Sequence, residues 1–315
     1  MLDRLVARVL KEIHNRPLPP ATDAERTALA DLREAFRSIP VMNTVSALPS
    51  ERAWLANMNR LRELVLTRDP RRFLRWDVVA HTMFLAHAPY VRMELRYLQS
   101  RPDWSHRWSR AIGEDSVGDP NRYFFYPASS ANLIHHAYHL AQFEERSGCR
   151  VDQMDDIVEF GGGYGSMCRL VHRLGFAGRY LIFDLPAFSA LQRFFLESLS
   201  FPVVAPPTWL ASRRGVCCTS EIEVFESLCA DAARSDSPMF LATWSLSEAP
   251  LSLRDHVMRS VSRFKAFLIG YQDRFGEVDN LAAFDALTRS TTAVSWQNVP
   301  FEPSKGNRYL IGTAL

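Results

Sequence analysis

A cluster of glycines follows an acidic residue in the middle of the chain. Four of the five residues from 161 to 165 are glycines, although the 315 residues contain only 14 glycines in all. An apolar run that ends at Glu159 and Phe160 precedes the cluster, and apolar residues at helical spacing follow it. A strand, a glycine turn and a helix in this order bring the main chain close to a bound cofactor.

The spacing of these glycines distinguishes two kinds of cofactor site. A dinucleotide-binding turn has the pattern G-x-G-x-x-G, and Ser166 stands where its third glycine would be. The pattern E-x-G-x-G-x-G, by contrast, is complete from Glu159 to Gly165. A second acidic residue, Asp184, ends the next apolar run, in the segment LIFDLP. The residues therefore favour a site built from acids and close main-chain approach over a dinucleotide site.

Three histidines lie shortly before this turn. His135, His136 and His139 belong to a segment whose spacing predicts a helix, from a serine cap at 129 or 130 to Gly148. His135 and His139 are four residues apart, which is the spacing of two metal ligands on one helix face. A histidine at such a position can also act as a general base or pack in the core. The spacing leaves these alternatives open.

The composition narrows the class of protein. With 37 Lys and Arg against 35 Asp and Glu, the net charge of +2 gives no general attraction to nucleic acid or membranes. The N-terminal segment lacks the continuous apolar core of a signal peptide, and no stretch approaches the roughly 20 apolar residues of a spanning helix. Five cysteines without a CxxC pair indicate reduced thiols. We therefore expect a cytoplasmic protein that neither binds nucleic acid nor spans a membrane.

The elements that must position these residues follow two different patterns. Helical spacing dominates up to about residue 150, and apolar strands alternate with helices from residue 155 onward. We expect strands at 156–160, 180–183, 239–244 and 266–271, with another at 202–206 or 216–219. Helices are expected between them at 164–174, 187–199, 221–233, 251–263 and 279–289. Two further β-rich runs, 291–301 and 307–315, predict a terminal antiparallel hairpin beside a parallel, doubly wound α/β sheet.

The acid-and-glycine pattern resembles the first motif of class I S-adenosylmethionine-dependent methyltransferases. Further segments are similar to those of the bacterial sugar O-methyltransferases: HHAYHLAQFE, EFGGGYG, FDLP with the following LQRFFL, TWSLSE and GYQDRFGEVDN. The resemblance covers roughly residues 125 to 315. It implies a Rossmann-like α/β fold, with a seven-stranded, mostly parallel sheet and a C-terminal antiparallel hairpin. The implied domains are a helical N-terminal region, 1–125, for substrate, lid or oligomer contacts, and a cofactor-binding catalytic domain, 126–315.

The resemblance also implies an activity and a cofactor. The expected reaction is methyl transfer from S-adenosylmethionine to a hydroxyl of a sugar in a glycan, a glycolipid or a glycosylated metabolite, which leaves S-adenosylhomocysteine. Glu159 would lie near the methionine end of the cofactor, and Asp184 would accept hydrogen bonds from the ribose hydroxyls. The expected cofactor contacts are Glu159, Gly161, Gly163, Tyr164, Gly165, Ser166, Asp184, Leu185, Trp244 and Ser245.

A sugar hydroxyl is a weak nucleophile and benefits from a general base. The candidates are the three histidines and Glu248, and we expect His136, His139 or Glu248 to serve. Some sugar O-methyltransferases use a divalent ion, for which Glu248, Asp273, Glu277 and Asp279 are the candidate ligands. We expect no metal, because TWSLSE offers one acid and no paired aspartate.

Other interpretations stay open. They are methylation of a non-sugar small molecule or of nitrogen or carbon, a nicotinamide-dependent oxidoreductase, and a non-catalytic subunit that binds a partner through its helical half. The Ser166 position and the terminal hairpin argue against the oxidoreductase. TWSLSE replaces the Asn/Asp-Pro-Pro-aromatic motif of many N-methyltransferases. Association into a homo-oligomer is compatible with the sequence.

Overall fold

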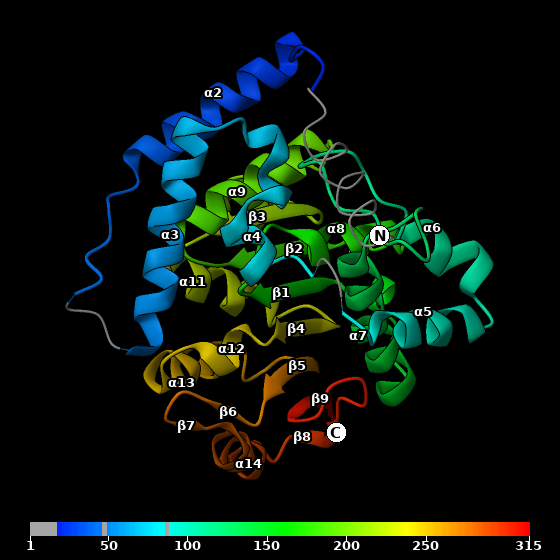
Figure 1. Cartoon of the computed structure of the whole chain (residues 1–315). Coiled ribbons are helices and arrows are strands. Elements are labelled where there is room, and N and C mark those ends of the chain that lie inside the picture. Colours follow the sequence, from blue (N-terminus) through cyan, green and yellow to red (C-terminus); the bar gives the residue numbers. More distant parts are fainter. Residues whose placement is uncertain (1–17, 46–48, 86–87) are drawn as a thin grey trace.

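A seven-stranded sheet forms the centre of the computed structural model, which describes residues 18–45, 49–85 and 88–315 (Figure 1). The N-terminal segment that lacks the apolar core of a signal peptide, residues 1–17, lies outside the described residues. From one edge to the other the strands are β3 (Gly215–Thr219), β2 (Arg179–Phe183), β1 (Asp156–Phe160), β4 (Pro238–Thr243), β5 (Ala266–Gln272), β9 (Asn307–Ala314) and β8 (Val294–Pro300).

Strands β1 to β5 pair in parallel, and β9 pairs antiparallel with both β5 and β8. The parallel strands are continuous apolar runs because helices cover both faces of the sheet, and every residue of β1 and β3 is buried. The predicted seven-stranded, mostly parallel sheet with a C-terminal antiparallel hairpin is therefore confirmed. Of the two alternatives for the third strand, 216–219 is correct, since Val203 makes only a single bridge to Val216.

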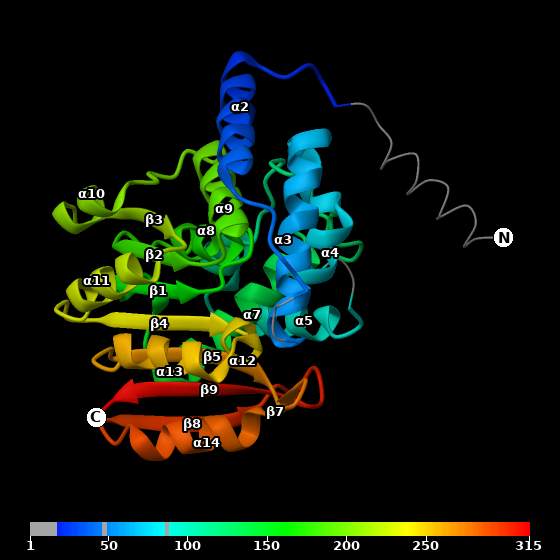
Figure 2. The same cartoon turned by 90° about the vertical axis from the view of Figure 1, so that its left-hand side faces the viewer.

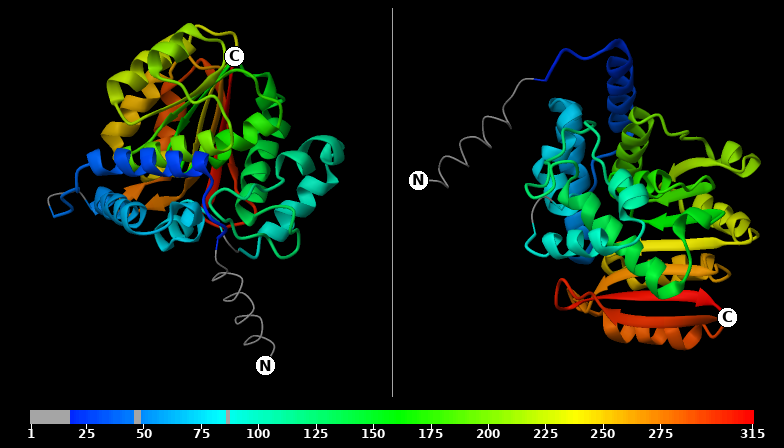
Figure 3. Two further views of the ribbon diagram at one scale, coloured as in Figure 1. Left: turned by 90° about the horizontal axis from the view of Figure 1, so that it is seen from above. Right: turned by 90° about the vertical axis from the view of Figure 1, so that its right-hand side faces the viewer.

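Helices pack on both faces of the sheet (Figures 2 and 3). One face carries α7 (Ala131–Ser147), α8 (Ser166–Arg173) and α9 (Pro186–Ser198), and the other carries α11 (Ile222–Ala232), α13 (Leu251–Ser260) and α14 (Asn280–Ser290). Short elements that the spacing did not predict are α10 (Pro206–Ala211), α12 (Ser245–Glu248), β6 (Arg274–Phe275) and β7 (Val278–Asp279).

The N-terminal helices lie beyond the carboxyl ends of the parallel strands, as Figure 2 shows. They are α2 (Asp23–Ser38), α3 (Pro49–Thr67), α4 (Asp77–Thr82), α5 (Val91–Ser100) and α6 (Ser109–Ala111), with short 3₁₀ or π turns at Pro70–Arg75, Trp104–Trp108 and Val151–Gln153. Helix α2 begins with a capping box between Thr22 and Glu25 and buries Leu29, Leu32 and Phe36. One continuous hydrophobic cluster joins these helices to the sheet, so the cavity between them has packed walls.

Among the described residues, none of the helices combines the length and the apolar character needed to cross a membrane.

Candidate active site

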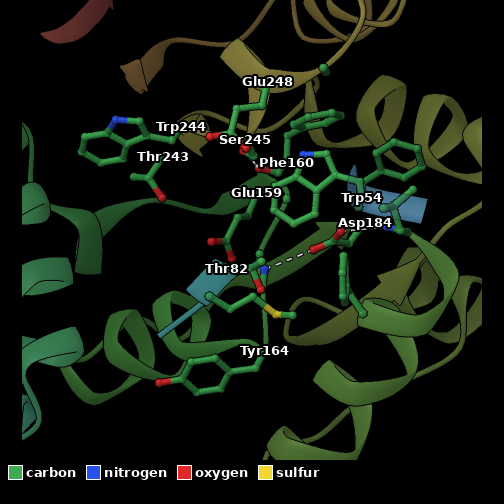
Figure 4. Close-up of a pocket in the computed structure, with 18 of the residues that line it drawn as sticks. Trp54, Thr82, Glu159, Phe160, Tyr164, Asp184, Thr243, Trp244, Ser245 and Glu248 are labelled. Atoms are coloured by element: carbon green, nitrogen blue, oxygen red, sulfur yellow. Dashed lines mark hydrogen bonds between the residues drawn. The ribbon is translucent and has the colours of Figure 1, made fainter. Parts of the chain in front are cut away.

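A cavity of about 800 Å³ lies between the N-terminal helices and the ends of β1, β2 and β4. This is where ligands bind in open α/β sheets, and the volume falls within the roughly 300–1,000 Å³ of small-molecule sites. Its walls are the glycine turn, the end of β2, the loop after β4, one face of α7, and residues of α3 and α4 (Figure 4).

The glycine turn after β1 lies in direct contact with the segment that follows β4. Gly161 has a φ of +74°, and a Cβ at this position would lie 2.2 Å from the Cβ of Ser245. Ser245 Oγ donates a hydrogen bond to the carbonyl of Phe160, so the end of β1 and the start of α12 are in direct contact. Only glycine combines this backbone conformation with such an approach. The turn therefore presents bare main chain to the cavity.

The other residues of the turn have different places. Gly163, Tyr164 and Ser166 line the cavity, whereas Gly165 does not. Gly165 instead precedes α8 in a left-handed conformation, and a Cβ added to it would lie 3.3 Å from Leu196 and 3.5 Å from Phe195. Its contribution to a bound cofactor would therefore be indirect, through the position of the helix.

Glu159 is buried at the end of β1 and lines the cavity. The hydroxyl of Tyr180 donates to its Oε2 at 2.9 Å. Burial raises the pKa of Glu159 to about 8, because a carboxylate loses solvation in this position. The group is thus largely neutral at pH 7 until a ligand supplies positive charge.

Asp184 follows β2 and holds the glycine turn in place. Its Oδ2 accepts from the amide of Gly163 at 3.1 Å and from Gln192 Nε2 at 2.8 Å, and its Oδ1 accepts from the amide of Leu185 at 2.8 Å (Figure 4). A carboxylate has about four acceptor positions, so about one remains for a ligand. Helix α9 begins without a side-chain cap, so Asp184 is not its N-cap. Burial raises the pKa of Asp184 to about 7.

Trp244 adopts a rare backbone conformation directly after β4. Its φ is +66°, which is an outlier for a bulky residue and needs support from its surroundings. Its amide donates to the carbonyl of Gly270 at 2.7 Å, and its Nε1 donates to Asn307 Oδ1 at 2.6 Å. The indole is thereby fixed beside α7, with the ring of His139 at 5.0 Å. Strain of this kind is often found at functional sites.

The predicted helix of the histidines is confirmed: Ser130 caps α7, and Gly148 ends it with a φ of +71°. His135, His136 and His139 all line the cavity. Burial lowers the pKa of His136 to about 3 and that of His139 well below its ordinary value. Both rings are therefore neutral at physiological pH, and each is a weaker base than free histidine.

Glu248 lies on α12 at another wall of the cavity. Its carboxylate accepts from Gln272 Nε2 at 3.3 Å and from the side chain of Trp54, and burial raises its pKa. The other candidate metal ligands are not gathered with it, since Asp273, Glu277 and Asp279 do not line the cavity. Asp279 instead caps α14 through the amide of Ala282.

Asn132 and Trp54 are two of the cavity residues that were not identified from the sequence. Asn132 donates to Tyr164 Oη at 3.0 Å and to Ser166 Oγ at 3.2 Å, and it accepts from the amide of Leu85 at 3.0 Å. Its position three residues before His135 on the same helical face is a signal that could have identified it. Trp54 of α3 packs edge-on against Phe188 at 5.9 Å, and no local pattern indicates this contact.

The cavity wall contains several acids and, among the described residues, neither lysine nor arginine. Acidic side chains at four positions line it, while no lysine or arginine is among its lining residues in the described ranges. The acids are Glu51, Glu159, Asp184 and Glu248. Such a cavity favours a cationic or neutral ligand over one that carries phosphate groups.

Comparison with known proteins shows similarity at the level of structure. No family model matches the chain, and no curated protein matches it. Magnesium protoporphyrin IX methyltransferase from Synechocystis PCC 6803, solved with bound S-adenosylmethionine, is 12% identical, with 73% of this chain and 99% of that chain covered and a TM-score of 0.39. Precorrin-6y C5,15-methyltransferase from Geobacter metallireducens GS-15 is 14% identical, with 64% and 97% covered and a TM-score of 0.39.

The glycopeptide N-methyltransferase MtfA is 13% identical, with 56% of this chain and 94% of that chain covered and a TM-score of 0.36. The assignment of the fold itself rests on this chain's strand order, in which an antiparallel β9 separates β5 from β8. The chain has the Rossmann-like α/β fold expected of class I methyltransferases.

Proposed function

We propose that the protein is an S-adenosylmethionine-dependent methyltransferase that acts on a hydroxyl group of a sugar. The observation that carries the proposal is a cavity lined by glycine main chain and by acids, without lysine or arginine among its described lining residues. S-adenosylmethionine is attracted to such a wall through its sulfonium and ammonium charges, whereas a nicotinamide dinucleotide would place a pyrophosphate there. The bound cofactor would supply an activated methyl group.

The residues present fit this cofactor. Asp184 retains about one acceptor position, which suits a ribose hydroxyl, and Glu159 offers a carboxylate to the positively charged methionine end. Gly161 and Gly163 allow close approach of the main chain. We propose further cofactor contacts from Tyr164, Ser166, Leu185, Trp244 and Ser245, which also line the cavity.

The proposal of a sugar as the methyl acceptor rests on the part of the cavity wall formed by α7 and Trp244. Neutral histidines and an indole can bind a polyol through hydrogen bonds and apolar contact, and no lysine or arginine among the described lining residues would pair with an anionic acceptor. Buried Nδ1 of His136 and Nε2 of His139 make no hydrogen bond within the described part of the chain. We propose that hydroxyl groups of an acceptor supply the partners that these buried atoms lack.

The proposal is tested by methyl transfer to defined sugars. The full-length protein is incubated with methyl-labelled S-adenosylmethionine and methyl glycosides of glucose, galactose, mannose and rhamnose, and products are identified by mass spectrometry. We expect an O-methylated glycoside that is lost in Asp184→Ala, and turnover that survives EDTA. Methylation of small amines but of no glycoside would contradict the sugar assignment. Loss of turnover with EDTA and its recovery with magnesium would contradict the metal-free mechanism.

A further inference from the structure

A buried carboxylate on α5 contacts His135, one of the three histidines of α7 that line the cavity. Glu94 is completely buried, and its Oε1 lies 2.7 Å from Nδ1 of His135. The other oxygen, Oε2, has no hydrogen-bond partner within the described residues. A buried carboxylate is costly unless a hydrogen-bond donor or a cation compensates it. His135 is the group that Glu94 can hold in this position.

The contact with Glu94 fixes which nitrogen of His135 faces the ligand. Because Nδ1 is bound to the carboxylate, Nε2 is the remaining nitrogen, and it makes no hydrogen bond within the described part of the chain. The side chain is 13% exposed and lines the cavity. The ring is stacked on Trp244 at 5.9 Å and lies edge-on to Phe301 at 5.8 Å, so its orientation is held by packing.

The carboxylate distinguishes His135 from its two neighbours on α7. His136 and His139 have no acidic partner in the described structure, and His139 Nδ1 is instead bonded to the hydroxyl of Tyr309. A carboxylate that binds one imidazole nitrogen selects its tautomer and stabilises the imidazolium that forms when the other nitrogen takes a proton.

We propose that His135 is the general base of the reaction and that Glu94 is its positioning residue. This inference rests on the proposed function and assigns a residue to its proton-transfer step. The acceptor oxygen forms a bond to the methyl carbon while the bond between carbon and sulfur breaks, and that electron pair stays on sulfur. The hydroxyl proton moves to Nε2 of His135. The products are a methyl ether, S-adenosylhomocysteine and an imidazolium paired with Glu94, which later returns its proton to water.

One acid lies in direct contact with His135. The charged or titratable groups that face it are Glu94 and Tyr90 from α5 and the turn before it, and His136 and His139 from α7. Of these, Glu94 is the acid in direct contact. Glu94→Gln removes this acid and should therefore lower kcat.

The test compares Glu94→Gln and His135→Asn with a matched control, Glu226→Gln. Glu226 forms a similar pair with His256, 2.7 Å apart, on α11 and α13 outside the cavity. For a methyl glycoside acceptor, we expect His135→Asn to lower kcat by roughly 10²–10⁴-fold and Glu94→Gln to lower it less. The affinity for S-adenosylhomocysteine should stay within about threefold in both variants, and the control should match the wild type.

A second measurement keeps the inference testable without turnover. Nitrogen-15 NMR of histidine-labelled protein with S-adenosylhomocysteine should show a proton on Nδ1 and none on Nε2 of His135 at pH 8. The Nδ1 proton signal should shift in Glu94→Gln. A proton on Nε2, or full activity of His135→Asn, would overturn the assignment of the base. Failure of the wild type to bind S-adenosylhomocysteine would instead overturn the proposed function.

Discussion

At the scale of single residues, Asp184 and Glu159 determine how the charge of the cavity changes with pH. Burial raises the pKa of Asp184 to about 7 and that of Glu159 to about 8, so both groups carry protons over part of the physiological range. A bound cation stabilises the ionised forms of both groups. Binding of a cationic ligand should therefore release protons, and the affinity should rise as the pH rises.

The first prediction follows from this linkage. Between pH 5.5 and 7.5 the dissociation constant of S-adenosylmethionine should fall by up to roughly tenfold per pH unit for one coupled group. Calorimetry in buffers of different ionisation enthalpy measures both the affinity and the released protons. Asp184→Asn should reduce the change of the dissociation constant with pH. The affinity for S-adenosylhomocysteine, which lacks the sulfonium, should depend less on pH than that for S-adenosylmethionine. A pH-independent affinity for S-adenosylmethionine would contradict this account.

At the scale of elements, the contact between the glycine turn and Ser245 of α12 determines whether the turn tolerates a side chain. Gly161→Ala places a methyl group 2.2 Å from Ser245 Cβ in a left-handed backbone conformation. We expect a loss of about 2 kcal/mol or more in the free energy of unfolding and weak binding of S-adenosylhomocysteine. Gly276→Ala is the matched control, because Gly276 has a φ of +55° but no atom within 4 Å of the added Cβ. Equal stability losses in the two variants would show that the contact with Ser245 is unimportant.

Particular helices and strands show which parts of the fold could be predicted from the sequence. The parallel strands were predictable because both faces of the sheet are covered, which makes each strand a continuous apolar run. Helix α10 was missed, although Pro206 and Pro207 at its first turn are typical of a helix start. Glu159 and the glycines form a local pattern that a sequence displays directly. The pair of Glu94 and His135 is separated by 41 residues, and only the packing of α5 on α7 brings it together.

Closure of the cavity by the N-terminal helices is a property of the whole molecule. Trp54 from α3 bonds Glu248 of α12 and packs against Phe188 of α9, so three elements meet over the cavity (Figure 4). Trp54→Ala removes both contacts and should raise the dissociation constant of S-adenosylhomocysteine roughly tenfold, or about 1.4 kcal/mol. Trp54→Phe keeps an aromatic ring, so its dissociation constant should lie between those of the wild type and Trp54→Ala. Fluorescence competition measures the three affinities, and identical values would exclude a role for Trp54 in retaining the cofactor.

The central claim is that this cavity binds a sulfonium cofactor, and calorimetric titration with four ligands tests it most directly. The full-length protein is titrated separately with S-adenosylmethionine, S-adenosylhomocysteine, NAD and NADP at pH 7.5. We predict binding of both S-adenosyl compounds at one site per chain and no heat of binding with either dinucleotide. Binding of NAD or NADP together with the absence of S-adenosylhomocysteine binding would contradict the proposed function.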